Sequence, residues 1–175
     1  MSKPLSANAL IDALQLQPLP EEGGFFRVVH RSFHVVPASV LPDGFDTARP
    51  LGTAIDFLVT TDSFSALHHL QGEERYVFVL GDPAEQFRLH PDGRTETVLL
   101  GHDFEAGQQL HTVVPPNVWQ GTRPSPAHKA LGYSLFSISV TPGFEQADFA
   151  MADVEALRQA HPHAAESIRR FAAPA

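Results

Sequence analysis

The chain has 175 residues, a length typical of one domain, and 43% of them are apolar, enough for a single sizeable core. Its formal net charge is −8 with neutral histidines, so the surface would repel a phosphate backbone and we expect no nucleic-acid partner. The chain has no cysteine, which excludes disulfides, thiolate nucleophiles and cysteine-ligated zinc, and which favours a cytoplasmic location. No apolar run is long enough to span a bilayer, so no membrane partner is expected.

The N-terminal part of the chain predicts one short helix and one strand. Ser6 is a suitable N-cap for a helix over residues 7–16, which prolines end. The pair Gly23-Gly24 allows a close backbone approach before a strand over residues 25–30. Residues 37–50 are rich in proline, glycine and aspartate and predict a surface loop.

From residue 52 onward, strand signals recur at short and regular spacing. Segments rich in β-branched and aromatic residues, bounded by turn residues, occupy 53–60, 63–70, 75–80, 84–90, 94–100, 110–114, 118–122 and 130–140. Such a series, with no helical pattern inside it, predicts a mainly all-β fold: a closed or nearly closed antiparallel barrel or jelly roll.

Beyond residue 149 the pattern becomes helical, with helices expected over 152–160 and 163–172. No internal repeat or linker marks a second domain. We therefore expect a single domain over 1–175, with a barrel over about 24–145 and a helical segment over about 150–173.

The stretch from His68 to Gly81 carries the strongest functional signal. His68 lies near the end of one predicted strand and Glu74 follows a short turn just before the next, so in an antiparallel hairpin their side chains would lie side by side. The two-residue strand period puts four side chains on one face: Glu74, Tyr76, Phe78 and Leu80. If that face points inward, a carboxylate and a phenol lie inside the mouth of the barrel.

This stretch resembles the first cupin motif, G-x5-H-x-H-x3,4-E-x6-G. His68, Glu74 and Gly81 match it, whereas Leu70 stands at the second histidine. A weaker second motif falls on residues 115–120, where Gln120 stands at the histidine position.

A closer resemblance covers nearly the whole chain up to about Ala150, and it is to the DUF985 or Cupin-5 family of the RmlC-like cupin superfamily. The pieces that carry it are 20–27 (PEEGGFFR), 31–32, 53–55, 65–68 (SALH), 73–74, 81–83 (GDP), 114–115, 118–120 (VWQ) and 141–144 (TPGF). The resemblance implies a double-stranded β-helix barrel, usually dimeric, and no established reaction.

The chain looks like a divergent member of this family. The family usually has Glu-Thr-Tyr at residues 28–30, Tyr at Asp56, Arg at His69 and Trp-His at Tyr76-Val77. Several of these positions would line or border the pocket.

Three residues are candidates for acid–base chemistry. His68 would be the general base or acid, Glu74 would orient it, and Tyr76 could donate a proton. The alternatives are a hydrogen-bonded structural histidine and a strand-end carboxylate paired with an arginine.

A second set of residues is predicted to bind ligand. Arg27 could hold a carboxylate or phosphate with two hydrogen bonds, or form a surface salt bridge. Asp56 either enters the pocket or marks the polar face of its strand. The remaining candidates are His69, which a regular strand would point away from His68, and Phe78, Trp119 and Gln120.

A cupin metal normally takes three histidines and one glutamate. Here the ligands would be His68, Glu74 and Gln120, and glutamine is a weak ligand for a transition metal, so no metal or other cofactor is favoured. The leading hypothesis is a protein that binds a small polar metabolite, with metal-free acid–base chemistry of an isomerase or epimerase on a sugar-like substrate. The alternatives are an enzyme dependent on a divalent transition metal, such as a dioxygenase or isomerase, and a non-enzymatic ligand-binding homodimer.

Overall fold

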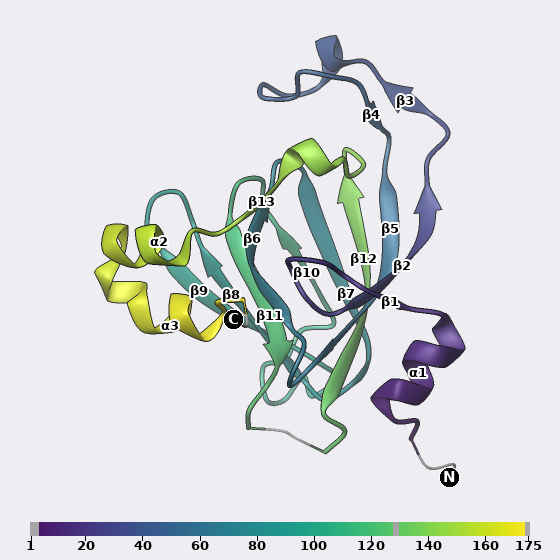
Figure 1. Cartoon of the computed structure of the whole chain (residues 1–175), viewed down its shortest axis with the longest axis vertical. Coiled ribbons are helices and arrows are strands. Elements are labelled where there is room, and N and C mark those ends of the chain that lie inside the picture. The colour runs from purple at the N-terminus through teal and green to yellow at the C-terminus, as the bar shows by residue number, and fades with distance from the viewer. Residues whose placement is uncertain (1–3, 128–129, 174–175) are drawn as a thin grey trace.

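Two antiparallel sheets face each other and enclose the core of the protein (Figure 1). The computed structural model describes residues 4–127 and 130–173. The first sheet has the order β1 (Gln17–Pro18), β2 (Phe25–Arg31), β5 (Thr53–Thr60), β12 (Tyr133–Thr141), β7 (Glu73–Gly81), β10 (His111–Val114). The second has the order β13 (Phe149–Met151), β6 (Ser65–Leu70), β11 (Trp119–Pro124), β8 (Ala84–Leu89), β9 (Thr95–Leu100). The expected all-β jelly roll is confirmed.

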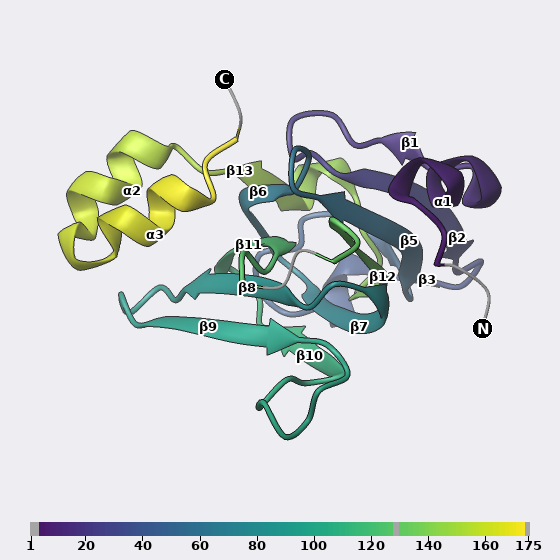
Figure 2. The same ribbon diagram turned by 90° about the horizontal axis from the view of Figure 1, so that it is seen from below.

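Helices cover the outer faces of both sheets. Helix α1 (Ala7–Leu14) begins at Ser6, whose hydroxyl accepts from the backbone N–H of Ala9, and it packs Leu10 on the outer face of the first sheet. Helices α2 (Val154–Ala160) and α3 (Ala165–Arg170) pack on the second sheet (Figure 2). No helix in the described part of the chain is long and apolar enough to cross a membrane.

Strand β5 shows how the two-residue period divides interior from exterior. Phe57 and Val59 are buried between the sheets, whereas Leu58 points outward and packs under α1. Every second residue therefore faces the interior, as the pleat requires.

The predicted strands from residue 53 to 140 are all present, with ends that differ by a few residues at most. The short strands β1, β13, β3 (Val35–Val36) and β4 (Arg49–Pro50) were not predicted. A strand of two or three residues is too short to show an alternation of apolar and polar residues. It forms only because the tertiary structure supplies a strand to pair with. Strands β3 and β4 pair with each other in an arm that projects from the barrel (Figure 1). Within residues 4–127 and 130–173 the chain also forms three short 3-10 helices, Ala38–Val40, Gln146–Asp148 and Pro162–Ala164.

The expected hairpin between His68 and Glu74 is wrong. Strand β6 pairs with β11 and β13, and β7 pairs with β12 and β10, so the turn at Gln71-Gly72 crosses from one sheet to the other. The inward face predicted for Glu74, Tyr76, Phe78 and Leu80 also ends before Leu80. The register of β7 against β12 shifts between Phe78 and Leu80, and Leu80 is exposed rather than inside.

Candidate functional site

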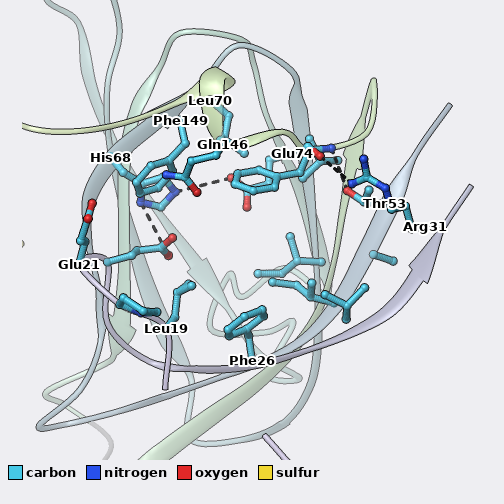
Figure 3. A pocket seen from close by; sticks show the side chains of 18 residues that line it. Leu19, Glu21, Phe26, Arg31, Thr53, His68, Leu70, Glu74, Gln146 and Phe149 are labelled. Carbon is cyan, nitrogen blue, oxygen red and sulfur yellow. Dashed lines mark hydrogen bonds and ion pairs between the residues drawn. The ribbon is translucent and has the colours of Figure 1, made fainter. Parts of the chain in front are cut away.

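A cavity of about 520 Å³ lies between the two sheets. Eighteen residues line it: Leu19, Pro20, Glu21, Glu22, Phe26, Val28, Arg31, Thr53, Ala54, Ile55, His68, Leu70, Glu74, Ile138, Val140, Phe144, Gln146 and Phe149. Figure 3 shows His68 on one side of this space and Arg31 on the other. Eleven of the lining residues are apolar, and the polar groups gather mainly around His68.

His68 is almost fully buried, and its imidazole lies between two carboxylates. The Nδ1 atom is 2.9 Å from the carbonyl oxygen of Ala66 and 3.8 Å from Oε1 of Glu22. The Nε2 atom is 3.9 Å from Oε2 of Glu74, which reaches in from the facing sheet. Both nitrogens therefore have a carboxylate within ion-pair distance (Figure 3).

The turn before β2 brings Glu22 into this site. Gly23 has φ of +93°, and a Cβ there would lie 2.5 Å from the carbonyl oxygen of Phe64, so the close approach of the two chains requires glycine. The backbone N–H of Ala66 donates to the carbonyl oxygen of Glu22, which holds the turn against β6. The hydroxyl of Ser65 then donates to Glu22 Oε1 over 2.7 Å.

The side-chain amide of Gln120 connects the two sheets inside the barrel. Its Nε2 lies 2.6 Å from Oε2 of Glu74, 2.9 Å from Nε2 of His68 and 3.1 Å from the hydroxyl of Tyr76. Gln120 is directly opposite His68 across β11 and β6, so their side chains share one face of the sheet.

A chain of buried hydrogen bonds fixes the orientation of this amide. Arg88 Nε donates to Gln86 Oε1 over 2.9 Å, and Gln86 Nε2 donates to Gln120 Oε1 over 3.1 Å. A guanidinium can only donate and an ionised carboxylate can only accept. The hydrogens therefore run in one direction, from Arg88 through both glutamines to Glu74.

Burial and charge shift the acid–base groups of the site in different ways. Burial by itself would lower the pKa of His68, but the charges of Glu22 and Glu74 outweigh it and raise the pKa to about 9. Burial raises the pKa of Glu22, and it raises that of Tyr76 well above its ordinary value.

The two protonation states of His68 require different partners. A nitrogen that accepts from the Gln120 amide carries no proton, so the 2.9 Å contact fits a neutral ring with its proton on Nδ1, facing Ala66. A protonated Nε2 would donate instead, and Glu74 is the acceptor nearest to it. The site can thus take up or release a proton with a small change at Gln120.

The structure brings together four of the predicted site residues: His68, Glu74, Tyr76 and Gln120. Phe78 lies deeper in the barrel, where it packs against Phe136. It is not part of the lining of the cavity.

The other four lie away from the cavity and pair with each other. Arg27 and Asp56 face each other across β2 and β5 and form an ion pair of 2.6 Å, while their strand neighbours line the cavity. His69 points to the outer face, where its ring meets Trp119 edge-on at 4.3 Å between centroids. The structure thus matches the salt-bridge alternative for Arg27 and the regular-strand expectation for His69.

Sequence reasoning missed several polar residues of the site, chiefly Glu22 and the buried donors Gln86 and Arg88. One signal was available for Glu22, because the acidic pair stands next to Gly23-Gly24, where a close backbone approach was expected. Gln86 and Arg88 gave no comparable signal, since their strand reads as an ordinary alternating one.

The residues present do not fit the metal that a cupin fold implies. The side-chain nitrogen of Gln120 lies between His68 Nε2 and Glu74 Oε2, and its N–H groups carry no lone pair that could bind a metal. Leu70, at the position of the second histidine, supplies no ligand atom either. Among the residues described, no three histidine, aspartate or glutamate side chains are grouped so that they could hold a metal ion.

Two facing antiparallel sheets with a polar-ended cavity between them define a jelly-roll protein of the cupin type. The chain belongs to Cupin_5, described as Cupin superfamily (DUF985), whose family model matches residues 8–152. The resemblance seen in the sequence is thereby confirmed.

Two solved structures with the same fold span nearly the whole chain, and a further relative is similar to it in sequence. A hypothetical protein from Leishmania major is 31% identical with a TM-score of 0.88, over 97% of this chain and 100% of that one. Protein SO0799 from Shewanella oneidensis is 30% identical with a TM-score of 0.83, over 98% and 100%. The uncharacterized protein YML079W of Saccharomyces cerevisiae is 28% identical over 83% of this chain and 74% of its own.

Oxalate decarboxylase from Bacillus subtilis is a more distant structural neighbour. It is 13% identical with a TM-score of 0.52, over 90% of this chain and 38% of the enzyme. At that level of identity the likeness extends to the fold alone.

Proposed function

We propose that this protein binds a small metabolite in the cavity and that His68 exchanges a proton with it without a metal. The observation that carries the proposal is the buried imidazole with a carboxylate on each side, at 3.8 and 3.9 Å, on the wall of a cavity of about 520 Å³. A cavity of this size with a few convergent polar groups is typical of small-molecule sites.

A histidine whose pKa is tuned by carboxylates suits general acid–base catalysis next to a carbonyl group. Glu74 would orient His68 and balance its charge, and Gln120 would hold Glu74 in place. Tyr76 lies behind Gln120 and outside the lining, so its part is to support the amide. Epimerisation and isomerisation are the reactions that such a set of groups would serve.

The test begins with a thermal-shift screen of the purified protein against sugars, nucleotides, carboxylates and amines. Ligands that bind are then incubated with the protein in deuterium oxide, and proton NMR follows exchange of carbon-bound hydrogen. We expect exchange with the natural protein and none with His68→Gln. The matched control is His69→Gln, because the neighbouring histidine points to the opposite face. Binding without exchange in either protein would support a non-enzymatic binding protein instead.

We also propose that the chain forms a homodimer, which the resemblance to its family led us to expect. Apolar side chains are exposed on β2 and on the arm, with Val28, Val29, Phe33, Val35 and Val40 among them. A second copy of the chain would cover this surface, which borders the cavity at Val28. Light scattering should give the mass of a dimer, and Phe33→Asp should shift it towards the monomer. A monomer at micromolar concentration would contradict this proposal.

A further inference from the structure

The polar end of the cavity has more acidic groups than cationic ones. Glu22 and Glu74 both line it, and each lies within 4 Å of His68. A single imidazole can balance only one carboxylate. Among the described residues, Arg31 is the only lysine or arginine on the lining, and it lies across the cavity from His68 (Figure 3). It is bound to the side chain of Glu145 and to the carbonyl oxygen of Phe144.

Glu22 is the carboxylate with the weaker support, because its side-chain donor is a single hydroxyl group. Within the part of the chain described, Ser65 is the one side chain that donates a hydrogen bond to it, and that bond reaches Oε1. Its Oε2 keeps its lone pairs for a donor. Glu74 also accepts from a described side chain at one oxygen only, Oε2, but its donor is the Gln120 amide, which a buried chain of hydrogen bonds from Arg88 holds in place. A buried carboxylate without a full set of donors is costly, and burial accordingly raises the pKa of Glu22.

The rest of the cavity is apolar. Phe26, Ile55 and Ile138 line it, and further aliphatic and aromatic residues complete the wall. A free sugar would place its hydroxyl groups against these side chains and lose hydrogen bonds to water. A ligand with an apolar body would instead bury that body there.

We propose that the natural ligand is a small organic amine, with its ammonium group bound at Glu22 and an apolar body against the wall formed by Phe26, Ile55 and Ile138. This inference rests on the proposed function of the cavity as a ligand site and specifies the class of ligand. The ammonium supplies the missing positive charge and donates to Glu22 Oε2. A carboxylate ligand at this end would meet Glu22 and Glu74, and the one arginine that the described residues place on the lining is already paired with Glu145.

The test compares ligands that differ only in their head group. Benzylamine, benzyl alcohol and benzoate form one series, and cyclohexylmethylamine, cyclohexylmethanol and cyclohexanecarboxylate form the other. Isothermal titration calorimetry with the intact chain measures the dissociation constant of each. Because charge-assisted hydrogen bonds are about twice as strong as neutral ones, we expect the amine to bind roughly tenfold or more tightly than the alcohol, and the carboxylate least.

Glu22→Gln should remove most of the preference for the amine over the alcohol while both ligands still bind. Glu73→Gln is the matched control. It removes the same charge from an exposed residue of β7 outside the lining, and it should leave the preference intact. An equal loss in both variants would mean that long-range charge, and not contact with Glu22, selects the ligand, and that would overturn the assignment.

The outcomes separate this inference from the proposed function. Binding of the carboxylates as tight as that of the amines would overturn the amine assignment, while the cavity would stand as a ligand site. Failure of both series at millimolar concentration would also overturn it. If the wider screen of sugars, nucleotides and carboxylates then gave no ligand either, the proposed function would fall as well.

Discussion

His68 and Glu74 lie on facing sheets, with Nε2 and Oε2 3.9 Å apart, although only a short turn at Gln71-Gly72 separates their strands. The turn crosses the barrel, so both side chains point inward from opposite walls. The amide of Gln120 joins them, since it lies 2.9 Å from the histidine nitrogen and 2.6 Å from the carboxylate oxygen. These three residues therefore form one buried group that links the two sheets.

Gln120→Leu should destabilise the protein, because it leaves Glu74 buried without its amide donor. We expect a loss of about 1–3 kcal/mol in the free energy of unfolding, measured by urea denaturation. Glu74→Gln combined with Gln120→Leu should lose less than the sum of the two single changes, because no buried charge is then left without a donor. Gln146→Leu, at the exposed rim of the cavity, is the control and should change stability little. Additive losses would show that Gln120 and Glu74 do not interact.

His68 should make stability depend on pH in the neutral to alkaline range. Its pKa in the folded protein, about 9, lies above the ordinary value of 6.5, so the folded state holds the proton more tightly than the unfolded one. The resulting stabilisation is fully present below pH 6.5 and is lost as the pH rises through about 9. Melting temperatures across this range should fall for the natural protein and fall less for His68→Gln. Parallel curves for the two proteins would show that the ring stays neutral when folded.

The buried pair of Arg49 and Asp148 should anchor the arm to the rim of the cavity. Arg49 Nε and Nη2 donate to the two carboxylate oxygens of Asp148 over 2.7 and 2.6 Å. Asp148→Ala leaves a buried guanidinium without its carboxylate partner and should cost about 3–5 kcal/mol in the free energy of unfolding. The control is Glu166→Ala, which breaks the exposed pair with Arg169 and should cost about 1 kcal/mol or less. If urea denaturation shows an equally small loss of stability for Asp148→Ala and Glu166→Ala, the arm is held by other contacts.

Divalent metals should have no specific effect on the site. The atoms that would ligate a cupin metal, His68 Nε2 and Glu74 Oε2, already contact the Gln120 amide, and Leu70 has no ligand atom. We expect melting temperatures to be the same with a chelator and with manganese, iron or zinc in slight excess. Elemental analysis of protein purified without chelator should give sub-stoichiometric metal, unchanged by Glu74→Ala. A stoichiometric metal that this variant loses would restore the metal-dependent alternative.

The sequence by itself determined the strands and part of the polar group at the candidate site. The alternation of apolar residues and the spacing of proline and glycine predicted each strand from residue 53 to 140, because local period and turn chemistry are properties of short segments. The spacing of His68, Glu74 and Gln120 also predicted which residues would meet, since it follows a motif whose geometry belongs to the fold.

Tertiary structure decided which faces those residues share. The face of a side chain depends on the pairing of its strand, so Arg27 and Asp56 turned outward together, and His69 met Trp119 outside the barrel. Glu22 reached His68 because the turn at Gly23 packs against a strand some forty residues away, as the contact with Phe64 shows. Contacts of that kind join segments distant in the chain, and no local pattern records them. The grouping of charged side chains on the lining of the cavity is therefore a property of the folded chain.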